Sequence, residues 1–174
     1  MRAPQLVVVE TDGWIARLLA DLTTEGAWLV RPAAAADALA RVRDRHPSVL
    51  VVQLDPNDGA AAAGALTLVS DASRLFPDVP VVVVSDVKFN DADRIAWTAA
   101  LFDLGARYAL FPPLTRPVFE DVVSGLMGAA GRRAGTTAPA APPPSAPLKP
   151  RPPRQKAQPE EDVIDLADEE DVDG

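Results

Sequence analysis

A strongly apolar run, Val49–Leu54, lies between Pro47 and the turn sequence Pro56-Asn57-Asp58-Gly59. β-Branched and aliphatic residues bounded by turn formers are typical of a parallel strand that is covered on both faces. In such sheets ligands bind at the carboxyl ends of the strands. The chemistry open to Gln53 and Asp55, at the end of this run, therefore largely decides what the protein can do.

Strand and helix patterns alternate on both sides of this run. Further strands are predicted at Leu6–Val9, Ala27–Val30, Val79–Val84 and Tyr108–Phe111, and helices at Trp14–Thr23, Ala34–Arg45, Ala60–Leu75, Asp91–Leu104 and Thr115–Met127. Five strands, each followed by a helix, predict an α/β fold with a doubly wound, five-stranded parallel sheet. Right-handed crossovers favour the flavodoxin-like topology, with Ala27–Val30 near an edge of the sheet.

Apolar spacing also predicts which side of each helix faces the core. The predicted inward residues of the last two helices are Ile95, Ala96, Ala99 and Phe102, and then Val118, Val122 and Leu126. The third predicted helix is rich in alanine and carries Leu66, Leu68, Val69 and Leu75 as its larger apolar residues.

The chain has no cysteine, which excludes a disulfide framework, a thiolate metal site and a cysteine nucleophile, and fits a reducing cytoplasm. No signal peptide is evident, and no window approaches the roughly 20 apolar residues of a membrane span. We therefore expect a cytoplasmic protein without membrane insertion.

The net charge of −8 is unevenly distributed. Residues 1–131 hold 11 basic and 16 acidic residues, residues 132–159 hold 6 basic and none acidic, and residues 160–174 hold 9 acidic and none basic. An acidic body without a basic helix or stripe argues against nucleic acid as the main ligand.

The order of these elements, and the residues that begin and end the strands, resemble those of the receiver domain of two-component response regulators. The resemblance covers about residues 5–128, and four sequence features carry it: the acidic cluster Glu10-Thr11-Asp12 after the first strand, Pro47-Ser48, Phe76-Pro77-Asp78 before a strand that ends in Ser85, and Gly105-Ala106 before a strand that ends in Pro113. It implies the flavodoxin-like fold.

The resemblance also identifies the positions where a receiver is phosphorylated, and most of them have changed. Gln53 occupies the phosphoacceptor position, Glu10 and Thr11 the acidic pair, Pro112 the lysine position, and Ser85 the hydroxyl position. A neutral amide cannot be the nucleophile of an acyl-phosphate and is a poorer ligand for a hard cation than a carboxylate. Pro112 cannot balance phosphoryl charge. The changes predict a pseudo-receiver that holds no metal and no cofactor.

A different alignment of the third strand would preserve phosphorylation. If the strand register is shifted by two residues, Asp55 becomes the acceptor, on the same side of the strand as Gln53, and Glu10 with Asp12 becomes the acidic pair. The chain would then be a phosphorylatable single-domain response regulator. Pro56 directly after Asp55, and the missing lysine, count against this alternative.

Two further groups have an ordinary structural interpretation and a functional one. Asp86, Asp91 and Asp93 could form a metal cluster, but Asn90 or Asp91 is expected to begin the next helix. The segment Ala99–Leu114, with Tyr108 and Phe111, lies in the region that resembles the receiver family's partner-binding and dimerisation face. A protein partner or a second copy of the chain would bind there.

The composition changes after residue 130. Residues 131–159 include nine prolines between Pro139 and Pro159, so we expect a disordered, extended linker followed by a disordered tail. In the tail, residues 160–174, the aliphatic residues Val163, Ile164 and Leu166 lie within a frame of carboxylates. This pattern favours a linear motif that binds a basic protein surface, the alternatives being a solubilising tail or one that folds back on the basic linker.

The sequence contains no glycine-rich phosphate loop, no nucleophile elbow and no group of residues arranged around a catalytic base. We therefore expect a non-enzymatic adaptor or localisation factor of bacterial signalling: a receiver-like domain over residues 1–130, tethered to an acidic interaction motif.

Overall fold

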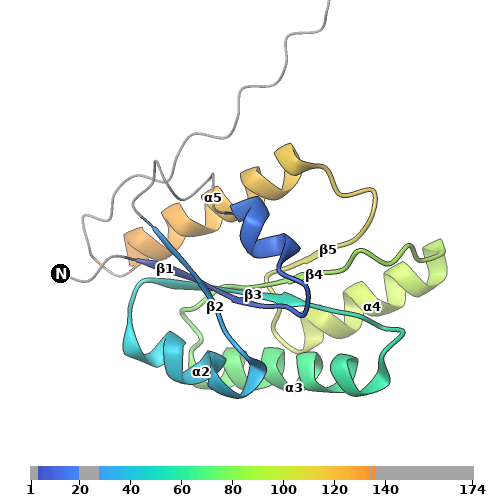
Figure 1. Ribbon diagram of the computed structural model, residues 1–174, viewed down its shortest axis with the longest axis horizontal. Coiled ribbons are helices and arrows are strands. Elements are labelled where there is room, and N and C mark those ends of the chain that lie inside the picture. Colours follow the sequence, from blue (N-terminus) through green and yellow to red (C-terminus); the bar gives the residue numbers. More distant parts are fainter. Residues whose placement is uncertain (1–3, 20–27, 134, 136–174) are drawn as a thin grey trace, which may run out of the picture.

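The computed structural model describes residues 4–19, 28–133 and 135, and its core is a five-stranded parallel sheet (Figure 1). The strands are β1 (Gln5–Val9), β2 (Leu29–Pro32), β3 (Ser48–Gln53), β4 (Val81–Val84) and β5 (Tyr108–Leu110). Their order in the sheet is β2-β1-β3-β4-β5, and every neighbouring pair is parallel. This confirms the predicted flavodoxin-like topology and the edge position of the second strand.

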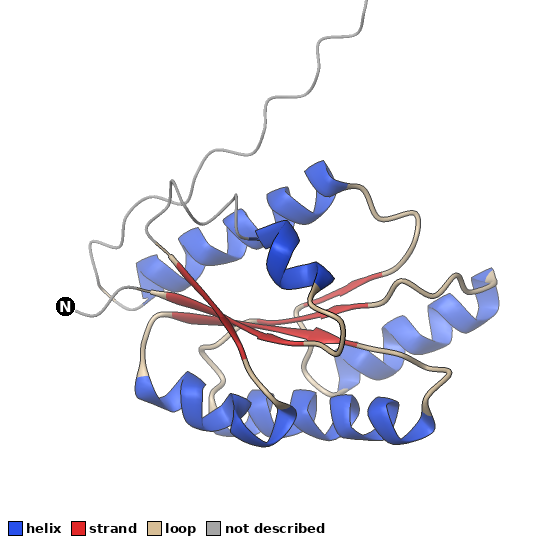
Figure 2. Cartoon of the chain, in the orientation of Figure 1, coloured by secondary structure: helices blue, strands red, loops and turns tan. Residues whose placement is uncertain are grey.

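Helices cover both faces of the sheet (Figure 2). They are α2 (Ala35–Asp44), α3 (Gly59–Leu75), α4 (Asp91–Asp103) and α5 (Arg116–Arg133), and residues 14–19 are also helical. One core cluster joins the sheet to α2, α3 and α4 through residues such as Val42, Val69 and Leu101. The other joins it to residues 14–19 and α5 through Ile15, Phe119 and Met127.

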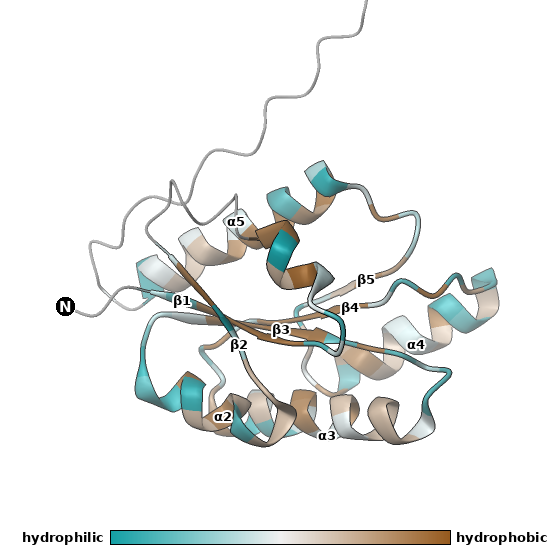
Figure 3. Ribbon diagram, in the orientation of Figure 1, coloured by the Kyte–Doolittle hydropathy of each residue, from teal (hydrophilic) through white to brown (hydrophobic). Residues whose placement is uncertain are grey.

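β3 is the central strand, as the sequence predicts. It pairs with β1 on one side and β4 on the other, and Val49–Val52 are completely buried. Alternation sends Leu50 and Val52 to one core cluster and Val49 and Val51 to the other. A strand buried on both faces needs the unbroken apolar run seen here, which Figure 3 shows as hydrophobic colour through the centre of the sheet.

A buried amide fastens the amino end of the sheet. Gln5 is completely buried, and its Nε2 donates to the carbonyl oxygens of Arg41 (2.6 Å) and Arg45 (3.3 Å) and to Ser48 Oγ (3.0 Å). The Ser48 hydroxyl in turn donates to the Arg45 carbonyl. These bonds satisfy carbonyls at the end of α2, where no further helical N–H is available. Gln5 therefore ties α2 to β1 and β3.

The predicted inner faces of α4 and α5 were wrong in part. Ile95, Ala96, Ala99, Phe102 and Val118 are exposed. In α4 a second apolar stripe, Trp97, Leu101 and Leu104, packs on the sheet instead. In α5 the buried stripe contains Phe119, Val123 and Met127, with Leu126 buried and Val122 half-buried. Both helices carry more than one apolar stripe, and periodicity alone does not choose between them.

Leu75, the last residue of α3, is also exposed. β2 begins at Leu29, two residues later than predicted, and α5 continues to Arg133, six residues past its predicted end at Met127.

The end of the first predicted helix, residue Ala27 and the segments 136–159 and 160–174, with Val163, Ile164 and Leu166, lie outside the described residues. Within the described part of the chain, no helix is both long and apolar enough to cross a membrane.

Candidate functional site

The end of the central strand is joined to the loop after β1. Gln53 is the last residue of β3, and its Oε1 accepts hydrogen bonds from the backbone N–H of Thr11 (2.8 Å) and from the Thr11 hydroxyl (3.2 Å). Thr11 follows β1 by two residues and Gln53 ends β3, and these two strands are neighbours in the sheet, where Val9 pairs with Val52. The structure therefore brings the predicted acceptor position and one acidic-pair position into direct contact, through neutral groups.

Glu10, the other acidic-pair residue, turns toward the following helix. Its two carboxylate oxygens accept from the backbone N–H groups of Ile15 (2.7 Å) and Ala16 (2.9 Å). These N–H groups lie in the first turn, where they have no partner within the helix and where the helix dipole favours negative charge. Both oxygens of Glu10 are thus engaged in capping, and a cation at the strand ends would have to compete for them.

Asp55 lies beyond the strand, in the turn to α3. Its Oδ1 accepts from the N–H of Asn57 (2.9 Å), as is typical of an aspartate that forms a turn. Asp58 caps α3 by accepting from Ala60 (3.0 Å) and Ala61 (3.1 Å). Asp55 is half-buried, and its second carboxylate oxygen accepts no hydrogen bond from the described residues.

The two remaining positions of the predicted site lie at the ends of β4 and β5. Ser85 is completely buried, its N–H donates to the Leu110 carbonyl (3.0 Å), and its Oγ accepts from Val87 N (3.3 Å). Pro112 follows β5, and the Pro112–Pro113 peptide is cis. Pro112 brings no side-chain donor to this corner, and Lys88, in the neighbouring β4–α4 loop, is exposed.

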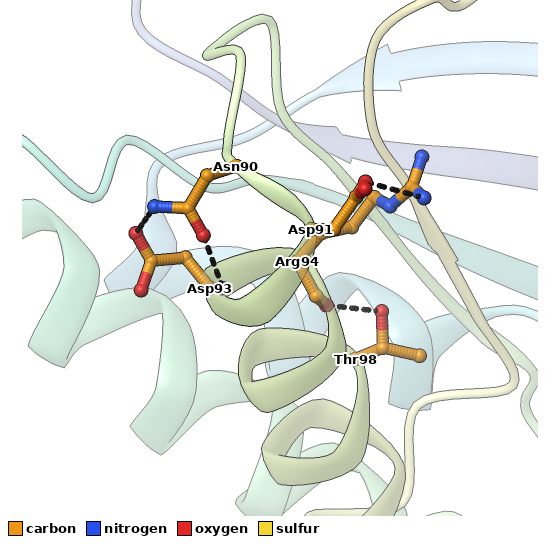
Figure 4. A network of polar contacts seen from close by, with 5 residues as sticks. All are labelled: Asn90, Asp91, Asp93, Arg94 and Thr98. Atoms are coloured by element: carbon orange, nitrogen blue, oxygen red, sulfur yellow. Dashed lines mark hydrogen bonds and ion pairs between the residues drawn. The ribbon is translucent and has the colours of Figure 1, made fainter.

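Asn90 caps α4, and Asp91 and Asp93 lie in its first turn (Figure 4). Asn90 Oδ1 accepts from Asp93 N (2.8 Å), its Nδ2 donates to Asp93 Oδ2 (2.7 Å), and Asp91 pairs with Arg94 at 3.1 Å. The interpretation of Asn90 as the helix start is confirmed. Among the described residues, no group of three or more histidine, cysteine or acidic side chains could hold a metal ion.

A cavity of about 510 Å³ opens beside Gln53, between β1, β3 and the first turns of α2 and α3. Gln53, Thr11 and Asp55 line its polar side. Its other walls are mostly small or aliphatic, and include Ala34, Ala61, Gly64, Ala65 and Leu68. Asp55 and Gln53 both line this cavity and are partly exposed, so the ends of β1 and β3 remain reachable from solvent.

An aromatic cluster that the sequence analysis missed packs under the β4–α4 loop. Phe89 lies edge-on to Phe111, with ring centroids 5.2 Å apart, and lies 6.3 Å from Trp97. Phe89 lies in the loop between β4 and α4, outside any helix or strand, so no periodic pattern indicates its position. The cluster holds the loop against β5 and α4.

Exposed apolar side chains gather at the margin formed by α4, β5 and α5. Ile95 is 67% exposed, Val118 51% and Phe102 49%, and together with Leu110, Phe111 and Leu114 they line a groove of about 550 Å³. We call this groove the α4–β5–α5 face. Phe111 is half-buried within it, whereas Tyr108, 40% exposed, lines a separate hollow on the α5 side of β5.

No family model matches the sequence, and no curated protein matches it either. Solved structures do match. The receiver domain of NtrX from Brucella abortus is 22% identical with a TM-score of 0.51, over 69% of this chain and 94% of that chain. A two-component response regulator from Clostridium difficile is 14% identical with a TM-score of 0.56, over 76% of this chain and 99% of that chain.

A third match is a CheY-like response regulator receiver domain protein from Methanospirillum hungatei, 15% identical with a TM-score of 0.55, over 75% of this chain and 99% of that chain. These similarities show that the chain has the receiver-domain fold, as the resemblance in the sequence implies.

Proposed function

We propose that this protein is a phosphorylation-independent interaction module of bacterial two-component signalling, an adaptor or localisation factor and not an enzyme. The contact between Gln53 and Thr11 carries the proposal. An amide oxygen that accepts two hydrogen bonds at the acceptor position offers no carboxylate for an acyl-phosphate and no charge for a divalent cation.

The surroundings of Gln53 support the same conclusion. Glu10 uses both carboxylate oxygens on helix N–H groups, and Pro112 replaces the ammonium that would balance phosphoryl charge. The rival acceptor, Asp55, retains a half-buried carboxylate at the cavity beside Gln53. A phosphorylatable regulator that uses Asp55 is therefore the second candidate, and phosphorylation of the full chain separates the two.

The α4–β5–α5 face supports an interaction role. Isolated apolar side chains on a protein surface are ordinary, but Ile95, Phe102 and Val118 line one groove. Burying a side chain of this size contributes about 1.5–3 kcal/mol, so a partner could gain most of its affinity from these residues. We propose that a protein partner, or a second copy of the chain, binds at this face, in addition to a partner bound by the acidic segment 160–174.

The test uses the full chain as bait for proteins from the source cell. Phe102→Asp should remove those partners that bind the α4–β5–α5 face, while Leu75→Asp should retain them. Leu75 is the matched control, because it is an equally exposed apolar residue at the end of α3, outside the groove. If both variants capture the same proteins as the wild type, and if analytical ultracentrifugation shows the same monomer for all three, the proposed face has no partner.

A further inference from the structure

Charged residues are distributed unevenly between the two ends of the sheet. At the carboxyl end, the loops after β1, β3 and β4 carry the carboxylates of Glu10, Asp12, Asp55, Asp58 and Asp86, with Lys88 as the cation of these loops. At the amino end, the helix termini and loops carry Arg45, Arg74, Arg107, Arg132 and Arg133, against Asp44, Asp78 and Asp103. An acidic ligand is therefore repelled from one end and attracted to the other.

The amino end also contains a groove that the proposed function does not use. It lies between α5 and the segments that enter β4 and β5, and consists of two adjoining hollows of about 670 and 610 Å³ that share Val79, Ala130 and Arg133. Its floor is apolar, with Val79, Val122, Leu126 and Ala130. We call it the amino-end groove.

Two arginines border this groove. Arg107 and Arg133 are exposed, and within the described residues neither guanidinium has a carboxylate partner, whereas Arg74, Arg94 and Arg116 each form an ion pair. Asp121 lines the larger hollow and Asp78 the smaller one, so the described lining carries two carboxylates beside the two arginines. The groove thus combines an apolar floor with two arginines that form no ion pair among the described residues.

We propose that the amino-end groove binds the acidic segment 160–174 of the same chain. Val163, Ile164 and Leu166 would cover the apolar floor, and neighbouring carboxylates would face Arg107 and Arg133. Surface ion pairs are individually weak, so in this arrangement the aliphatic side chains hold the segment in the groove and the two unpaired arginines orient it. Bound in this way, the segment would be withheld from any partner that recognises it.

The position of the groove favours the chain's own segment over a separate acidic peptide. Arg133, which ends α5, lines the groove, so residue 134 follows directly from its border. Residues 134–159 count 26 residues (159 − 134 + 1). At no more than about 3.3–3.6 Å per residue they can span up to roughly 90 Å, several times the roughly 14 Å radius of gyration expected for a domain of this size. Covalent tethering gives the segment an effective concentration on the order of millimolar, which compensates for weak contacts.

The experiment uses the full chain without any partner. Because the chain has no cysteine, Ala167→Cys offers a single site for a spin label next to Leu166. The label should broaden the amide signals of Gly125, Ala129 and Arg133 in the amino-end groove. It should leave those of Gly64 in α3 and Thr98 in α4 sharp.

Two sets of variants decide what holds the segment. Arg107→Glu with Arg133→Glu should abolish the broadening, and so should Ile164→Ser with Leu166→Ser. Arg17→Glu with Arg43→Glu is the matched control, because it changes the net charge equally at exposed arginines elsewhere and should keep the broadening. An unchanged pattern of amide signals outside the groove shows that each variant is folded.

Three outcomes would overturn the proposal. Broadening at Thr98 would place the segment on the α4–β5–α5 face, and broadening confined to residues 139–159 would place it on the basic linker. Broadening that also appears when spin-labelled chains without isotope enrichment are mixed with isotope-enriched unlabelled chains would show that a second copy supplies the segment. Since no partner is present, these results are independent of the proposed function, which the capture experiment tests.

Discussion

Thr11 donates both its backbone N–H and its hydroxyl to the side-chain oxygen of Gln53, at 2.8 and 3.2 Å. This pair of bonds closes the carboxyl end of the two central strands with uncharged groups. In a carboxylate-based site the same two positions would repel each other until a cation bridged them. Here they stabilise each other without a cation, and this difference leads to the first two predictions.

Phosphorylation is expected to fail. The full chain should form no acyl-phosphate with acetyl phosphate, because Gln53 has no nucleophilic carboxylate and Pro112 supplies no ammonium. Mass spectrometry and acid-resistant, base-labile incorporation of labelled phosphate would measure this. A stable adduct that disappears in Asp55→Ala would identify Asp55 as the acceptor and overturn the proposed function.

Magnesium at millimolar concentration should leave the melting temperature unchanged, because a ligand stabilises a protein only by binding its folded state. The double variant Thr11→Asp, Gln53→Asp should have a lower melting temperature without magnesium, owing to repulsion between the new carboxylates, and should regain part of it when magnesium is added. Calorimetry with and without a chelator measures both effects. A rise in the wild type's melting temperature with magnesium would contradict the prediction.

Removal of the buried amide of Gln5 should destabilise the fold. Gln5→Ala removes the side-chain donor of the Arg41 carbonyl and leaves the Arg45 carbonyl with the Ser48 hydroxyl, and should lower the free energy of unfolding by about 1–3 kcal/mol. Urea denaturation measures the change. Asn57→Ala, at an exposed turn position, is the control and should stay within about 0.5 kcal/mol of the wild type. Equal midpoints for the two variants would refute the role assigned to Gln5.

Two glycines should respond to alanine in opposite directions. Gly105 has φ +98°, and a Cβ there would lie 2.0 Å from Ser73 Oγ and 2.4 Å from Ser73 Cβ, so Gly105→Ala should destabilise by several kcal/mol. Gly64 lies inside α3, and a Cβ at this position would meet no neighbouring atom within 4 Å, so Gly64→Ala should stabilise by about 0.5–1 kcal/mol. Thermal unfolding of the two variants, side by side, tests the assignment. A neutral Gly105→Ala would show that Ser73 can move away.

Once a partner of the acidic segment is identified, its aliphatic and acidic residues should act on different rate constants. Ile164→Ala with Leu166→Ala should speed dissociation at every salt concentration, because apolar burial is little screened. Neutralising Glu169, Glu170 and Asp171 should mainly slow association, and chiefly at low salt, since salt screens charges over about 8–10 Å. Surface plasmon resonance at several salt concentrations separates the two effects. Unchanged affinity after deletion of residues 160–174 would leave the segment without a partner-binding role.

Much of the fold follows from the sequence alone. The apolar runs of β3 and β4, the turn residues after them and the helical spacing between them predicted a doubly wound parallel sheet, because strands buried on both faces tolerate no polar interruption. The sequence also identified Gln53 as the last polar side chain of the central strand, since only local chain order is needed for that prediction.

The tertiary structure decided which apolar stripe of α4 and α5 faces the sheet. Trp97 and Phe102 are equally plausible core residues in a periodic pattern, yet Trp97 packs on the sheet and Phe102 lies half exposed on a groove. Only the tertiary structure shows that Glu10 caps a helix and that Gln53 accepts hydrogen bonds from Thr11, because these contacts depend on how the loops and neighbouring strands align. Residue types and spacing therefore determined the layers of this protein. Packing between segments far apart in the sequence determined its surfaces and the partners of its polar groups.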